Sequence, residues 1–189
     1  MTWLPRPRRS AMQSIRKSGL AALSLVALGA CTAMAAGTYS QADLPPPIQV
    51  PAGNAVAWET VGTGDITYEC KAKENMKDQT EWVFAGPKAV LKDRQGRQVG
   101  TYYGPPATWE ANDGSKLTGT QVAVAPAGAG NLPYQLVRAN PVVGSGALTG
   151  VTHIQRVALK GGVAPQAACA AGQRTTVPYQ ADYIFWKAG

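Results

Sequence analysis

The sequence offers few side chains that could carry acid–base or nucleophilic chemistry. It contains one histidine, His153, and any Ser–His–Asp triad would have to use it. In the alternating stretch Val151–Leu159, His153 shares a strand face with Gln155 and Val157, which is typical of a hydrogen-bonded packing residue. No Gly-x-Ser-x-Gly nucleophile elbow occurs in the sequence. We therefore expect no hydrolytic triad.

Metal and nucleotide chemistry also lack the residues that they need. One histidine and three cysteines, one of them in an N-terminal leader, cannot supply the ligands of a zinc site. The sequence has no EF-hand spacing, no P-loop and no Rossmann glycine fingerprint. We expect neither a metal site nor a cofactor.

Aromatic side chains and carboxylates are the remaining candidates. The stretch TYYGPPATW, residues 101–109, contains three large rings, and DYIFW, residues 182–186, contains three more. Exposed rings could stack on a sugar or a peptide, whereas buried rings would fill the core. Glu110 and Asp113 follow the first stretch, so paired carboxylates near an aromatic cleft would make a glycan hydrolase. We name no catalytic residue, and five candidate binding residues: Tyr102, Tyr103, Trp109, Glu110 and His153.

Two cysteines outside the leader, Cys70 and Cys169, are expected to form a disulfide. An isolated pair in an exported chain is most simply a disulfide, the alternative being a nucleophilic thiol. Ile66, Tyr68 and Cys70 share one face of an alternating strand, so Cys70 should point inward. Closing a loop of about 100 residues would stabilise the fold by roughly 4.7 kcal/mol.

The first 35 residues are typical of a signal peptide. Basic residues between Arg6 and Lys17 precede an apolar run, Gly19–Ala30, which has the length of a secretory hydrophobic region. Two processing events are open. Cleavage after Ala35 would release a soluble protein, whereas lipidation of Cys31, in a lipobox-like context, would anchor the domain to a membrane surface. The sequence predicts a periplasmic or extracellular protein, or an outer-membrane lipoprotein.

Removing the leader removes most of the positive charge. The chain has 18 basic and 11 acidic residues, but five basic residues lie in the leader, which leaves 13 against 11. The remaining lysines and arginines are interleaved with acids and form no basic face for nucleic acid. We exclude nucleic acid as a partner and expect membrane contact only through a lipid on Cys31.

Period-two alternation broken by turn signals predicts an all-β domain over residues 48–189. About eight to ten short, mostly antiparallel strands favour a sandwich or a partly closed barrel. The prolines at 45–47 predict that residues 36–47 form an extended tether. The expected strands are residues 54–61, 66–72, 81–84, 89–92, 98–103, 107–110, 117–124, 134–139, 151–159 and 180–186.

Together these segments resemble an exported bacterial and fungal family, domain of unknown function 3455. The resemblance implies a secreted, β-rich domain and no particular activity. At two places the chain departs from the family pattern, which has His-Tyr at Tyr102-Tyr103 and Tyr at His153. This exchange suggests that Tyr102 and His153 are cross-strand neighbours. The matching stretches are ITYEC at 66–70, WVFAGPKAVLKDRQGRQVG at 82–100, GPPATWEANDGSKLTG at 104–119, VTHIQRV at 151–157, GGVAP at 161–165 and ADYIFW at 181–186.

The sequence thus favours an exported, non-catalytic binding or structural domain of the cell envelope. Its partner would be a small molecule, a glycan or an envelope protein. The alternative, from a different functional class, is an envelope hydrolase that acts on glycans.

Overall fold

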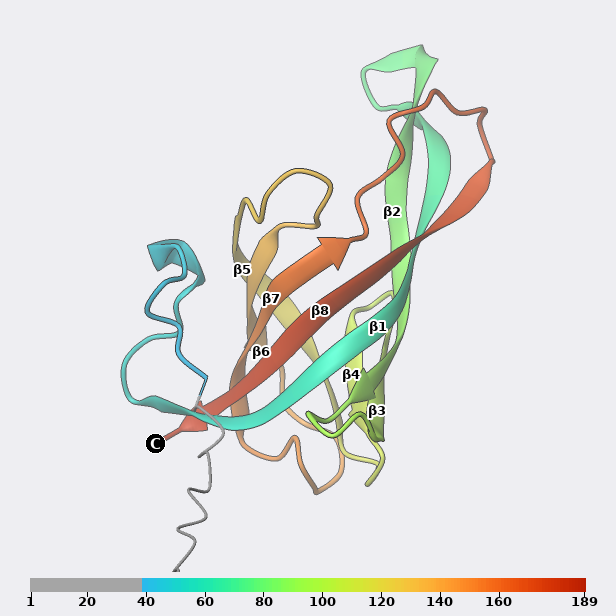
Figure 1. Cartoon of the computed structure of the whole chain (residues 1–189). Helices are drawn as coiled ribbons and strands as arrows, with labels where there is room; N and C mark the ends of the chain where they lie inside the picture. Colours follow the sequence, from blue (N-terminus) through green and yellow to red (C-terminus); the bar gives the residue numbers. More distant parts are fainter. Residues whose placement is uncertain (1–38) are drawn as a thin grey trace, which may run out of the picture. The chain divides into compact units, whose positions relative to one another are not determined.

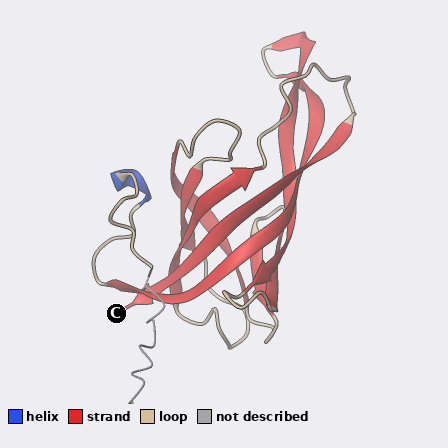
Figure 2. Ribbon diagram, in the orientation of Figure 1, coloured by secondary structure: helices blue, strands red, loops and turns tan. Residues whose placement is uncertain are grey.

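The computed structural model describes residues 39–189, which form a closed barrel of eight antiparallel strands (Figure 1). Each strand pairs with the next along the chain, and the last returns to the first. Figure 2 shows that strands make up nearly all of the regular structure. The all-β prediction is confirmed. The elements are η1 Pro46–Ile48, β1 Asn54–Lys73, β2 Met76–Lys92, β3 Gln98–Tyr103, β4 Thr108–Ala111, β5 Lys116–Ala125, β6 Tyr134–Ala139, β7 Val151–Gly161 and β8 Arg174–Ala188.

The predicted signal peptide and Cys31 lie outside the described residues, as does the start of the predicted tether. Between residues 39 and 189, no helix has the length and apolar character needed to cross a membrane.

β1 is one strand of 20 residues, where we expected two strands separated by a turn at Gly62–Asp65. That prediction was wrong because these glycines allow close approach within a sheet instead of breaking it. A Cβ on Gly62 would lie 2.6 Å from the ring of Tyr183. A Cβ on Gly64 would collide with the carbonyl oxygen of Lys88 on the neighbouring strand β2. β2 likewise continues through Gly86-Pro87, with a bulge opposite Thr67.

The short hairpin turns form where the sequence predicts them. Gly96, between β2 and β3, adopts a φ of 81°, and Asp93 Oδ1 accepts hydrogen bonds from the backbone N–H groups of Gln95 and Arg97. Gly114, between β4 and β5, adopts a φ of 85°. Both turns depend on local chemistry that a sequence displays directly.

The barrel has apolar packing on both sides of part of its wall. The main core fills the interior with residues such as Ile66, Leu91 and Phe185. A second cluster, built from Leu136, Val157, Ile184 and Trp186, lies on the outer face, and Tyr39 and Leu44 pack against it. Residues 39–50 therefore cover the outer face of the wall from β5 to β8.

This covering segment is not the extended tether that we expected. Pro46–Ile48 forms one turn of 3₁₀ helix with proline at its first position, and Ile48 is fully buried. Gln155, buried on the outer face of β7, holds the segment in place. Its amide donates to Ile48 O at 2.7 Å and Gln41 Oε1 at 2.9 Å, and it accepts from Tyr39 Oη at 3.2 Å.

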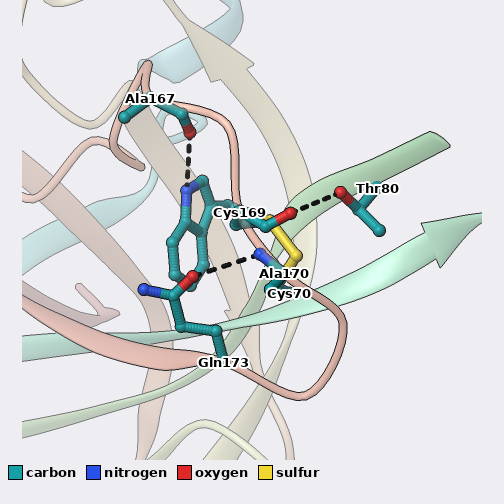
Figure 3. Close-up of a disulfide and its surroundings, with 7 residues drawn as sticks. Cys70, Thr80, Ala167, Cys169, Ala170 and Gln173 are labelled. Carbon is teal, nitrogen blue, oxygen red and sulfur yellow. Dashed lines mark hydrogen bonds between the residues drawn. A yellow bond between two sulfur atoms is a disulfide. The ribbon is translucent and has the colours of Figure 1, made fainter.

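The predicted Cys70–Cys169 disulfide is confirmed and joins β1 to the loop between β7 and β8 (Figure 3). The Cα atoms of the two cysteines lie 5.9 Å apart. Hydrogen bonds hold the same loop against β2: Thr80 Oγ1 donates to Cys169 O at 2.7 Å, and Trp82 Nε1 donates to Ala167 O at 3.0 Å. The loop is thus fixed to the barrel both covalently and by hydrogen bonds.

Substituting Gly64→Ala should destabilise the barrel by about 1–3 kcal/mol, the usual cost of overpacking. The added methyl group meets the backbone of β2, which can move only by disturbing the β1–β2 pairing. Urea unfolding measures the effect. The exposed neighbour Thr63→Ala is the control, expected within about 0.5 kcal/mol of wild type. Equal midpoints for Gly64→Ala and wild type would contradict the role of this glycine.

Removing the disulfide by the double substitution Cys70→Ala/Cys169→Ala should lower the free energy of unfolding by roughly 3–5 kcal/mol. The bond closes a loop with a sequence separation of 99 residues, so its loss increases the conformational entropy of the unfolded chain. Denaturant unfolding gives the value, and wild type in reductant should show the same loss. An unchanged midpoint under both conditions would refute the prediction.

Candidate functional site

The barrel interior contains a cavity of about 360 Å³. This volume lies in the lower part of the range of ligand-binding pockets, roughly 300–1,000 Å³. Its wall is built from the inward-facing side chains of β1 to β7 together with part of the β5–β6 loop. Among the described residues, no aspartate or glutamate lines it.

Stacked aromatic rings form one wall of the cavity. Tyr102 on β3 and Trp109 on β4 are directly paired, and their ring centroids lie 4.7 Å apart at an interplanar angle of 22°. Tyr183 on β8 packs against both, at 5.0 Å and 5.9 Å. The rings are at most 4% exposed. The indole Nε1 of Trp109 is buried and has no hydrogen-bond partner among the described residues.

Arg156 on β7 is the one charged residue in the described lining. It is 8% exposed, and its Nη2 donates to the carbonyl oxygen of Pro133 at 3.0 Å. Its Nε is buried and has no partner within residues 39–189. No carboxylate in that part of the chain forms an ion pair with it. Arg156 therefore brings to the cavity lining a positive charge that no carboxylate of the described residues compensates.

Sequence reasoning missed Arg156 because both faces of β7 are buried. Alternation separates His153 and Gln155 from Ile154 and Arg156 but does not say which pair faces inward. Because His153 alternates with Gln155 and Val157, the sequence favours their shared face as the core-facing one. In the structure this face is the outer one, and residues 39–50 cover it. Leu159 reaches the interior because a bulge at Ala158, with a φ of 51°, shifts the alternation.

Tyrosine hydroxyl groups lie close to the cavity. The hydroxyl oxygens of Tyr179 and Tyr183 are 3.1 Å apart, and Tyr68 Oη donates to Gly162 O at 2.6 Å. Burial raises the pKa of Tyr183 well above its ordinary value. Burial also raises the pKa of Tyr102, against the opposing effect of the positive charge on Arg156. These tyrosines are neutral donors or acceptors at physiological pH.

Polar and apolar groups share the mouth of the cavity. Gln135 Nε2 donates to Gln121 Oε1 at 2.6 Å, which joins β6 to β5 at the rim. Phe84 on β2 is 51% exposed and meets Tyr68 edge-on at 6.2 Å. Through these partly exposed residues the cavity reaches the surface.

The structure divides the five candidate binding residues between two environments. Tyr102 and Trp109 line the cavity. Tyr103 and Glu110 face outward, where Tyr103 Oη donates to Glu110 Oε2 at 2.6 Å, and this hydrogen bond raises the pKa of Tyr103. His153 faces outward opposite Arg138, and burial together with that positive charge lowers its pKa.

The suggestion that Tyr102 and His153 are cross-strand neighbours is wrong. β3 pairs with β2 and β4, whereas β7 pairs with β6 and β8. Tyr102 moreover points into the barrel and His153 points out of it.

The carboxylate of Asp113 serves the β4–β5 turn. It accepts hydrogen bonds from the Ser115 hydroxyl at 2.6 Å and from the backbone N–H groups of Ser115 and Ala147. These hydrogen bonds, that of the Ser115 hydroxyl most strongly, lower the pKa of Asp113. In the described chain, no group of three or more His, Cys, Asp or Glu side chains gathers in one place.

A larger hollow, about 870 Å³, lies on the outer face of β1, β2 and β3. Its rim carries exposed side chains of both charge signs, including Asp65 and Lys88. Such residues are well solvated, so this hollow presents a weaker case for a ligand site than the interior cavity.

Comparison with known proteins places the chain in a family. The family model described as "Protein of unknown function (DUF3455)" matches residues 51–187. This range covers most of the chain, so the chain belongs to the DUF3455 family, as the sequence resemblance implied. Neither a curated protein nor a solved structure matches it.

The buried tyrosines predict alkaline unfolding. Burial raises the pKa of Tyr102, Tyr179 and Tyr183 above the ordinary value of 10.0, whereas the unfolded chain ionises near that value. Their contribution to stability is therefore complete below pH 10 and is lost as the pH rises further. The tyrosinate absorbance of these buried rings should appear together with the change in circular dichroism. Ionisation of every tyrosine near pH 10 with the fold intact would contradict this expectation.

Proposed function

We propose that this DUF3455 member is an exported, non-catalytic binding domain that holds a small molecule inside its barrel. The observation that carries the proposal is the interior cavity of about 360 Å³, walled by aromatic rings and lined by Arg156, which has no ion-pair partner in the described chain. A concave, mostly apolar pocket with a few directed polar groups is the usual form of a small-molecule site.

Export is supported by the disulfide and by the leader. Disulfides persist in oxidising compartments and are rare in the cytosol, and Cys70–Cys169 is such a bond. The N-terminal 35 residues have the composition of a signal peptide. Export to the periplasm or the exterior accounts for both features.

A small molecule fits the site better than a glycan or a protein partner. A polymer needs a groove along which it can extend, whereas this cavity lies between the inward faces of paired strands. The hydrolase alternative would need two carboxylates across the ligand. The cavity has none in its described lining, and Asp113 is engaged in its own turn. Binding without chemistry is therefore the function that we favour.

A substitution that fills the mouth tests the proposal. Ala107→Trp places an indole in the cavity from the β3–β4 turn, while Ala52→Trp adds the same group at an exposed position outside the lining. In a thermal-shift screen of a small-molecule library, a ligand at about 100 times its Kd stabilises the fold by about 2.7 kcal/mol. We expect hits that raise the midpoint of wild type and Ala52→Trp by roughly 5–10 °C.

The same hits should leave the midpoint of Ala107→Trp unchanged. Hits that shift all three proteins equally would place the ligand outside the barrel. A library without any hit would count against small-molecule binding as a whole.

A further inference from the structure

We infer that the ligand of the barrel carries a single carboxylate, which pairs with Arg156, on a flat apolar body. This inference rests on the proposed function, because it assigns the chemistry of the molecule that the cavity would hold. It follows from the charge and the hydrogen-bonding groups of Arg156 and from the shape of the lining.

The charge on Arg156 lacks compensation within the described chain. A guanidinium keeps its positive charge at all physiological pH values. Burying such a charge without a partner is strongly unfavourable, and buried charges in proteins are ordinarily paired. The Pro133 carbonyl accepts the hydrogen bond of Arg156, and the tyrosines whose pKa values its charge lowers, Tyr68, Tyr102, Tyr179 and Tyr183, are neutral. An anionic group on the ligand would supply the missing partner.

The guanidinium calls for oxygen acceptors. It carries several N–H donors, and within the described residues Arg156 makes one side-chain hydrogen bond, from Nη2 to Pro133 O. A ligand that supplied only donors would leave the other N–H groups unsatisfied. A carboxylate has two acceptor oxygens and matches the planar fork of a guanidinium.

A monoanion fits better than a phosphate. Arg156 is the one charged residue in the described lining, so a dianion would leave a net negative charge inside the barrel. The rest of the lining is suited to an apolar ring: the rings of Tyr102 and Trp109 form a wall, and Val137 and Leu132 complete it. The amides of Gln121 and Gln135 offer polar contacts only at the mouth.

Titration calorimetry with three matched probes tests the inference. Benzoate is the monocarboxylate, benzamide has nearly the same shape without charge, and phenylphosphonate carries the larger and more highly charged anion. Because hydrogen bonds to charged groups are the stronger ones, we expect wild type to bind benzoate roughly 10- to 100-fold more tightly than benzamide. Phenylphosphonate should bind more weakly than benzoate.

Substitutions at Arg156 provide the second arm. Arg156→Met keeps an unbranched apolar side chain in place of the aliphatic part of the arginine and removes its charge, and it should abolish the preference for benzoate. Arg156→Lys keeps the charge but loses the planar fork, so benzoate affinity should fall roughly tenfold.

A purely structural arginine gives a different pattern. Replacing a buried unpaired ion by an apolar group is often neutral or stabilising, so ligand-free Arg156→Met should unfold at no lower temperature than wild type. If that variant unfolds at a much lower temperature while benzoate and benzamide bind wild type equally, Arg156 is structural and the inference fails.

The failures of the two proposals are distinguishable. Equal binding of benzamide and benzoate would show that the site does not select a carboxylate, while leaving a small-molecule site in place. Tighter binding of phenylphosphonate than of benzoate would contradict the inference that the ligand carries a single negative charge. Absence of binding by all three probes overturns the inference, and the library screen with Ala107→Trp then decides the proposed function separately.

Discussion

Closure of the sheet is the constraint on which the rest of the structure depends. β1 pairs with β2 along one side and with β8 along the other, and every strand of the ring has two neighbours. Closure needs strands that coil tightly and approach one another closely. Gly62 and Gly64 allow this, because a Cβ at either position would meet Tyr183 or the backbone of Lys88. Once the sheet is closed, the alternation of side chains becomes a division between interior and outer wall.

That division explains why the interior is filled unevenly. An eight-stranded barrel is wide enough to be filled by side chains or to hold one small ligand. Here the rings of Tyr102, Trp109 and Tyr183 fill part of the width, and Arg156 faces the space that is left. An apolar residue at position 156 would serve packing better than a cation does. Departures from the rules of stable packing concentrate at functional sites, and this is the clearest one in the described chain.

Features that depend on local chemistry could be predicted from the sequence, and features that depend on the closed sheet could not. The turns at Gly96 and Gly114 and the Cys70–Cys169 bond belong to the first kind. The continuous course of β1 belongs to the second, because Gly62–Asp65 resembles a turn until β2 and β8 are seen beside it. The aromatic wall was half predicted. Tyr102 and Trp109 were chosen for their rings, but their neighbours Tyr103 and Glu110 alternate to the outside. Arg156 was missed because both faces of β7 are buried, one in the interior and the other under residues 39–50. The alternation of the sequence therefore does not tell which face is the interior one.

The two faces of β7 also bear on how Arg156 should be understood. Gln155, its neighbour on the outer face, makes four hydrogen bonds: to Tyr39, Gln41, Ile48 and the indole of Trp186. The strand is therefore held firmly at this point, and its pairing with β6 and β8 continues on both sides. An unpartnered donor on a loosely held strand could turn toward a partner at little cost. On a strand fixed in this way, the direction of the Arg156 side chain is set by the fold, so its guanidinium is held in advance for an acceptor that enters the barrel.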